Sequence, residues 1–227
     1  MFLAAVFGAA TAAFLPRAAG RLAVGFADRP RRTCAFCARP FAPGVAGWIH
    51  AGPACSCSGG YVGTVLAGAA VATVLAVAVG TSALLPVYLV AAVPGLLLAL
   101  VDLRCLRLPD PLVGALAIGA GVPLALIRPE RVSVAVAAAG TVLTAYLVVA
   151  LMPRGGLGLG DAKLAAVLAL ILGFAGWPAV LTGMLAAHLI NGSIALALLI
   201  TGRADRRRPL AFGPALLTGA LVAIATA

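Results

Sequence analysis

Long apolar runs, separated by short breaks rich in proline, glycine and arginine, fill almost the whole chain. A helix that crosses a bilayer needs about 20 consecutive, predominantly apolar residues. The pattern therefore predicts an all-α protein, a polytopic membrane helical bundle of about eight transmembrane helices with a short cysteine-containing loop. The expected spans are residues 1–16, 61–80, 84–101, 111–127, 132–152, 162–175, 178–200 and 209–226.

The first of these runs, Phe2 to Leu15, is short for a membrane span. At about 1.5 Å per residue it does not cross a hydrocarbon core of about 30 Å. Either its helix continues past Pro16 and Arg17, or the protein begins upstream of Met1. No positive residue precedes the run, which argues against a cleaved signal peptide.

Composition supports the membrane interpretation, and a membrane location gives another explanation for the net positive charge. Hydrophobic residues make up 63% of the chain and charged residues 10%, with a mean hydropathy of +1.16. Soluble domains are about 45–50% apolar. A net charge of +10 could indicate nucleic-acid binding. In a membrane protein, arginines instead fix topology and meet anionic headgroups. We expect the lipid bilayer, and no nucleic acid, as a partner.

The distribution of basic residues predicts the orientation. With the N-terminus outside, the loops at 17–60, 102–110, 153–163 and 201–208 face the cytoplasm and hold 6, 2, 2 and 4 basic residues. The outer loops hold only Arg128 and Arg131. This asymmetry follows the positive-inside rule. It predicts a first span at 1–16, a cytoplasmic loop at 17–60 and a membrane-embedded domain at 61–227.

Three of the six acidic residues, Asp102, Asp110 and Asp161, lie at the ends of predicted spans on the same, cytoplasmic, side. An ionisable group near the membrane core is costly unless it is paired or hydrated, so Asp102 and Asp161 indicate function. Two carboxylates that share a site can exchange a proton and activate water. Asp161 also starts a helix, where free N–H groups can hold its carboxylate. The preceding Gly158 and Gly160 permit unusual backbone conformations or close approach.

Three motifs occur in one order along this part of the chain. Gly158-Leu159-Gly160-Asp161-Ala162-Lys163-Leu164 contains a GxGD pattern, Asp102 lies in Val101-Asp102-Leu103 ahead of Leu108-Pro109-Asp110, and Ala211-Phe212-Gly213-Pro214 precedes the last span. Together they resemble the bacterial type IV prepilin peptidases, which are GxGD-type intramembrane aspartyl proteases. The resemblance covers roughly residues 84–226.

The resemblance implies an aspartic endopeptidase in the bacterial cytoplasmic membrane, with Asp102 and Asp161 as its catalytic pair. The substrate would be a type IV pilin-like precursor whose basic leader stays in the cytoplasm ahead of an apolar helix. Proteolysis would need no cofactor. Asp110 would support the site, for example by capping the helix after Pro111. Lys163 would steer the charge of the pair, hold a headgroup or anchor the topology.

The cysteines of the 17–60 loop are a separate candidate site. Cys34 and Cys37 form a CxxC pair, and Cys55 and Cys57 form a CxC pair. Four thiols in a cytoplasmic loop are typical of structural zinc rather than disulfides, and His50 could replace one ligand. Unliganded thiols are the alternative. Many prepilin peptidases carry two CxxC pairs here, in a region tied to N-methylation of the trimmed pilin. The second pair in this chain is CxC instead of CxxC, which argues against retained N-methylation activity.

Two further interpretations stay open at this stage. His188, Asn191 and Ser193 lie in one predicted span, and we expect interhelical hydrogen bonds or a wet cavity there. Asp102 and Asp161 would also suit a small proton-coupled secondary transporter that uses them as a proton relay. A membrane scaffold with a zinc loop and no catalysis is the third hypothesis.

Overall fold

The computed structural model describes the chain except for residues 26–27, 36, 50–59, 153–156 and 203–209. Helices form nearly all of the described regular structure, and no strand occurs among the described residues beyond an isolated bridge between Thr33 and Pro40. The helices, in order, are α1 (Phe2–Ala12), α2 (Leu15–Leu22), α3 (Ala46–Ile49), α4 (Tyr61–Val79), α5 (Leu84–Cys105), α6 (Asp110–Ile127), η1 (Pro129–Arg131), α7 (Val132–Leu151), α8 (Leu159–Gly173), α9 (Trp177–Ile200) and α10 (Gly213–Thr226).

The predicted helical bundle is confirmed, and a helix occupies each of the eight predicted positions. Among the described residues, six helical segments are long and apolar enough to cross a membrane, so this is a multi-pass membrane protein. The other two, α8 and α10, have 15 and 14 residues. At about 1.5 Å per residue, 15 residues extend only about 22 Å.

The first helical segment extends further than its apolar run. Helix α1 ends at Ala12, and after a short break α2 begins at Leu15 with Pro16 in its first turn. Proline is tolerated there because the first N–H groups of a helix have no intrahelical partner. The apolar stretch therefore continues past Arg17 to Leu22 and reaches 21 residues. The boundary predicted at residue 16 falls inside α2.

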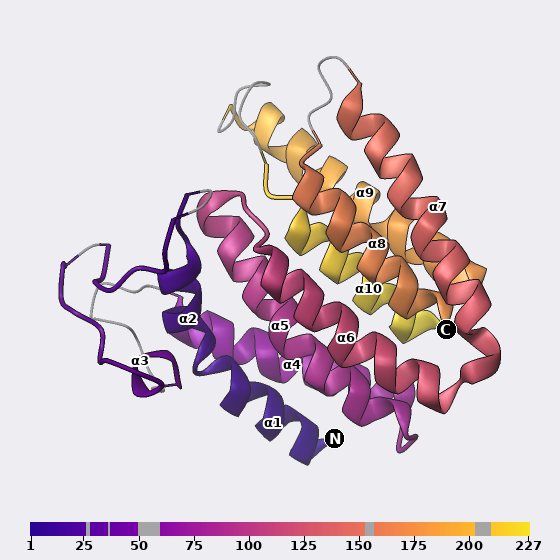
Figure 1. Cartoon of the computed structure of the whole chain (residues 1–227), viewed down its shortest axis with the longest axis horizontal. Helices are drawn as coiled ribbons and strands as arrows, with labels where there is room; N and C mark the ends of the chain where they lie inside the picture. The colour runs from indigo at the N-terminus through magenta and orange to yellow at the C-terminus, as the bar shows by residue number, and fades with distance from the viewer. Residues whose placement is uncertain (26–27, 36, 50–59, 153–156, 203–209) are drawn as a thin grey trace.

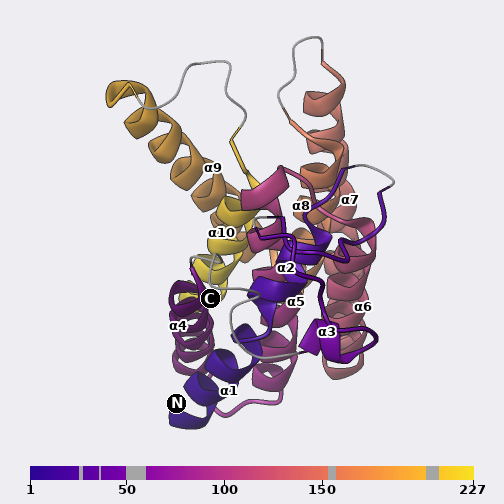
Figure 2. The ribbon, with the colours of Figure 1, turned by 90° about the vertical axis from the view of Figure 1, so that its left-hand side faces the viewer.

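The two short helices lie among the long ones. Helix α8 contacts α6, α7, α9 and α10 and buries most of its length, while α10 contacts α4, α5, α8 and α9. Figure 2 shows α7 and α9 diverging toward the end of the bundle where α8 and α10 begin. The largest fully buried side chains come from α5, α6, α8, α9 and α10: Leu98, Val101, Leu124, Leu164, Leu172, Val180 and Leu216.

Small residues set how closely the helices approach. A Cβ at Gly8 of α1 would collide with the carbonyl oxygen of Gly68 of α4, and a Cβ at Gly219 of α10 would collide with that of Gly183 of α9. Helices in lipid gain no hydrophobic free energy by associating, so their association depends on van der Waals contacts between closely packed backbones. The high glycine and alanine content of the chain therefore serves the packing of its helices.

Candidate active site

Asp102 lies in the last turn of α5, where its side chain is only 3% exposed. Its Oδ2 accepts a hydrogen bond of 2.8 Å from the backbone N–H of Gly213, the first residue of α10. The first N–H groups of a helix have no intrahelical acceptor, so this donor is available to the carboxylate. A Cβ at Gly213 would lie 2.8 Å from the same oxygen, so a side chain there would force a shift.

Asp161 lies in the first turn of α8, which begins at Leu159, three residues earlier than predicted. Its Oδ2 accepts a hydrogen bond of 3.3 Å from the backbone N–H of Gly158, which confirms that free N–H groups at this helix start hold the carboxylate. Gly158 itself has φ −74° and ψ 143°, a conformation open to any residue, so the expected special backbone is absent there.

Close approach is required at Gly158, where a Cβ would lie 3.1 Å from Asp161 Oδ2, and also at Gly160. A Cβ at Gly160 would lie 3.3 Å from the Cβ of Leu108, and one at Gly213 would lie 3.3 Å from the Cδ2 of the same leucine. Leu108 is therefore inserted between the starts of α8 and α10. Because it follows α5 by only a few residues, this insertion draws the end of α5, with Asp102, toward both helix starts.

The result is a pair of carboxylates from two helices that are far apart in the sequence. Asp102 and Asp161 are close enough for their charges to interact. In the described part of the chain, hydrogen bonds reach only Oδ2 of each carboxylate, and both come from glycine N–H groups. Oδ1 of each is left to interact with water or a substrate. Such a pair can take up and release a proton at one place.

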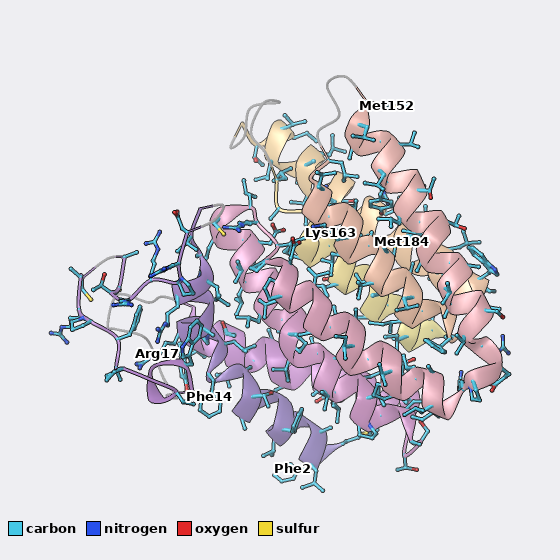
Figure 3. The ribbon with its side chains drawn as sticks, viewed as in Figure 1. Phe2, Phe14, Arg17, Met152, Lys163 and Met184 are labelled. Atoms are coloured by element: carbon cyan, nitrogen blue, oxygen red, sulfur yellow. The ribbon has the colours of Figure 1, made fainter. Side chains whose placement is uncertain are left out.

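The other two predicted site residues form a contact of their own. Lys163 Nζ lies 2.8 Å from Oδ1 and 2.9 Å from Oδ2 of Asp110, and both side chains are more than half exposed. Lys163 is seen toward the upper end of the bundle in Figure 3. The prediction that Asp110 caps its helix is wrong: Pro109 is the N-cap, no side chain caps it, and the Asp110 carboxylate binds Lys163 instead.

A family model described as the type IV leader peptidase family matches residues 89–202, which is half of the chain. The chain belongs to the type IV leader peptidase family. No curated protein and no solved structure matches it. The matched segment includes Asp102, Asp110, Asp161 and Lys163, and it excludes the cysteine loop and Gly213. Membership makes the protein a membrane peptidase.

Three aromatic rings lie beside the carboxylates of this peptidase. Tyr146 of α7 stacks on Phe212 with a centroid separation of 6.4 Å, and His188 of α9 contacts both rings edge-on. Phe212 precedes Gly213, and Tyr146 interacts electrostatically with Asp161. The sequence analysis did not assign Tyr146 to the site. The available signal was that Tyr146 is the one aromatic residue of α7.

The hydrogen bond of His188 also differs from the interhelical bond that we expected. Its Nδ1 lies 2.8 Å from the carbonyl oxygen of Met184, four residues earlier in the same helix, so this hydrogen bond is intrahelical. Figure 3 labels Met184, whose sulfur lies 3.7 Å from the hydroxyl of Tyr146. The interhelical contacts of His188 are ring contacts rather than hydrogen bonds.

Two arginines attach the N-terminal segment to the helix that carries Asp102. Arg104 donates to the carbonyl oxygen of Pro16 at 3.0 Å, and Arg107 donates to those of Val24, at 3.2 Å, and Gly25. The sequence analysis counted both arginines only as topological charges. Their contacts fix α2 and the segment after it against the end of α5.

The candidate zinc site is only partly within the described residues. Cys34 and Cys37 lie in a turn closed by hydrogen bonds from Cys34 N–H to the Arg39 oxygen, at 2.9 Å, and from Ala38 N–H to the Cys34 oxygen, at 3.1 Å. Cys55, Cys57 and His50 lie outside the described residues. Among the residues that the structure describes, no group of three potential ligands could hold a metal ion. Zinc stays a prediction.

Proposed function

We propose that this peptidase is an aspartic endopeptidase that removes the basic leader from type IV pilin-like precursors. Asp102 and Asp161 would be its catalytic residues, at the cytoplasmic face of the bacterial plasma membrane. The observation that carries the proposal is that these two carboxylates, each held through Oδ2 by one glycine N–H, lie where α5 ends and where α8 and α10 begin. The family match favours a peptidase over the transporter and scaffold hypotheses.

The proposed chemistry uses the two carboxylates in complementary states. The ionised member takes a proton from water as the water oxygen attacks the peptide carbonyl carbon. The protonated member donates its proton to the carbonyl oxygen. The tetrahedral intermediate then collapses: the ionised carboxylate takes a proton from one of its hydroxyl groups as the C=O bond forms, the C–N bond breaks, and the protonated carboxyl group donates its proton to the leaving amine. Gly213 and Gly158 hold one oxygen of each carboxylate, and the other oxygen would take part in the proton transfers.

The position of the pair supports cleavage at the cytoplasmic boundary. Asp102 and Asp161 lie where α5 ends and α8 and α10 begin. Arg128 and Arg131, the basic residues of the outer loops, lie between α6 and α7, and Arg128 donates to the carbonyl oxygen of Phe174 at the other end of α8. The charge asymmetry of the loops favours the cytoplasmic side for the end of the bundle that carries the carboxylates.

Co-expression with a pilin-type precursor tests the proposal. Asp102→Asn and Asp161→Asn should each leave the precursor unprocessed while the peptidase accumulates normally in the membrane. Asp110→Asn is the matched control, because Asp110 lies at the same membrane face but pairs with Lys163, and it should process the precursor. Normal processing by either of the first two variants would contradict the catalytic pair.

Proteolysis as proposed needs no metal, so the cysteine loop is tested separately. We propose structural zinc there, held by Cys34, Cys37, Cys55 and Cys57, and we do not propose N-methylation. Metal analysis of the purified protein should find close to one equivalent of zinc. Less than about half an equivalent would count against ligation.

A further inference from the structure

An apolar cavity of about 170 Å³ lies beside α5 and α10, with parts of α4, α6 and α8 completing its lining. The floor is buried and includes Ala91, Leu116 and Leu168, while Leu96 and Leu217 at the rim are partly exposed. Apart from the hydroxyl groups of Tyr88 and Thr218, every lining side chain is apolar. We call this cavity and its rim the α5–α10 groove.

The groove follows one stripe of each of its two main helices. On α5 the stripe runs over Tyr88, Ala91, Ala92, Gly95, Leu96 and Ala99, and on α10 over Pro214, Leu217, Thr218, Leu221 and Ile224. Spacings of three and four residues place side chains on one helix face. The groove is therefore a continuous feature of two packed helices.

One end of the groove is at the catalytic pair. Ala99 lies three residues before Asp102, so both are on the same face of α5. Pro214 directly follows Gly213, whose N–H holds Asp102. The other end lies toward the opposite end of the bundle, at Tyr88 near the start of α5 and Ile224 near the end of α10. From Ala99 back to Tyr88 the groove follows α5 for about 17 Å, at 1.5 Å per residue.

We propose that the α5–α10 groove binds the apolar helix of the substrate precursor, on the membrane side of the cleaved bond. This inference rests on the proposed function of Asp102 and Asp161. A chain that enters the bilayer from the catalytic pair has to satisfy its own backbone hydrogen bonds, which makes it helical, and its side chains meet an apolar lining. A length of about 17 Å matches about three helical turns.

The size of the cavity determines how such a helix would bind. An engineered cavity of about 150 Å³ holds a benzene molecule, so the groove accepts one or two large side chains rather than a whole helix. The small residues Ala92, Gly95 and Ala99 allow a helix backbone to come close along the rim. The substrate helix would lie along the groove and insert an apolar side chain into it.

The first test fills the groove away from the catalytic pair. Ala92→Trp places a large ring in the groove ten residues before Asp102. It should slow processing of a pilin-type precursor by at least about tenfold, because the ring fills space that a substrate side chain needs and an apolar site tolerates overpacking poorly. The matched control is Val90→Trp, on the same helix at a position that is 53% exposed. It should process the precursor at the original rate. Equal rates for the two variants would overturn the proposal.

The second test does not depend on cleavage, and it separates a protein helix from a lipid chain. Benzoylphenylalanine replaces Leu217, or Val90 as control, in an Asp161→Asn background, and membranes containing the precursor are irradiated. A covalent adduct with the precursor from position 217, above that from position 90, supports the groove. Adducts with lipid alone, or equal adducts from both positions, overturn it. Cleavage by Asp161→Asn itself would instead contradict the catalytic pair.

Discussion

Two aspartates close to the same turn of the chain, Asp102 and Asp110, have opposite environments. Asp102 is 3% exposed, and its described hydrogen bond comes from a neutral backbone N–H. The Asp110 side chain is 64% exposed and forms an ion pair with Lys163. The buried carboxylate has a second carboxylate as its charged neighbour, whereas the exposed one has a cation.

The different environments of Asp102 and Asp110 indicate different roles for the two carboxylates. An exposed ion pair contributes about 0–1 kcal/mol to stability. Burying a carboxylate beside another carboxylate destabilises a fold, so selection for stability alone does not explain Asp102. Perturbed charges without a stabilising partner are concentrated at functional sites. The comparison therefore supports the catalytic role proposed for Asp102 and leaves Asp110 with a supporting contact, and four substitutions test this division.

The largest effect is expected for Asp102→Asn. Cleavage should fall by about 10³-fold or more, because the pair loses a proton-transferring group. The melting temperature in detergent should stay the same or rise, because an amide costs less to bury and can still accept from Gly213 N–H. Parallel loss of activity and stability would show instead that Asp102 holds the fold together.

Gly213→Ala should have the next largest effect. The new Cβ would lie 2.8 Å from Asp102 Oδ2, so the carboxylate or the start of α10 has to move. Displacement of a catalytic group by about 1 Å can cost about 100-fold, and we expect a fall of about 10- to 100-fold in kcat with little change in KM. Gly114→Ala is the control, because a Cβ there meets nothing within 4 Å. A Gly213→Ala enzyme with full kcat would remove Gly213 from the site.

Gly160→Ala tests the insertion of Leu108 and should be milder. The added Cβ would lie 3.3 Å from the Leu108 Cβ, a contact that asks for a shift of a few tenths of an ångström. We expect the free energy of unfolding to fall by about 1 kcal/mol, the lower end for overpacking. Denaturation experiments on Gly160→Ala and on the control Gly140→Ala, whose new Cβ would meet open space, measure this free energy of unfolding. Equal stabilities for the two variants would argue against the insertion.

The smallest effect is expected for Lys163→Gln. Loss of the exposed ion pair should lower the free energy of unfolding by at most about 1 kcal/mol and leave cleavage within about twofold. Asp110→Asn should match it, and the double variant should be no worse than either alone. A large loss of cleavage by Lys163→Gln would return Lys163 to the role first considered for it, steering the charge of the pair.

The sequence predicted much of this architecture because apolar runs and loop charges are local properties. They predicted the bundle and all eight helix positions. The order of the motifs indicated the family, and charge counting put Asp102 and Asp161 at one face. The same methods failed to predict side-chain contacts that depend on a neighbouring helix. Asp110 was expected to cap a helix and instead binds Lys163 of α8. His188 was expected to bond between helices or to line a wet cavity; its hydrogen bond lies within α9, and its contacts with other elements are the rings of Tyr146 and Phe212.

By itself, the sequence determined that helices cross a membrane, and it predicted their orientation and the two aspartates, Asp102 and Asp161, at one end of the bundle. Only the tertiary structure decided how they meet. Leu108 inserts between Gly160 and Gly213, and the first N–H of α10 holds Asp102. These contacts depend on how α5, α8 and α10 rotate and tilt against one another. Hydrophobic periodicity does not specify that rotation in helices that are apolar on every face, because packing of small residues sets it.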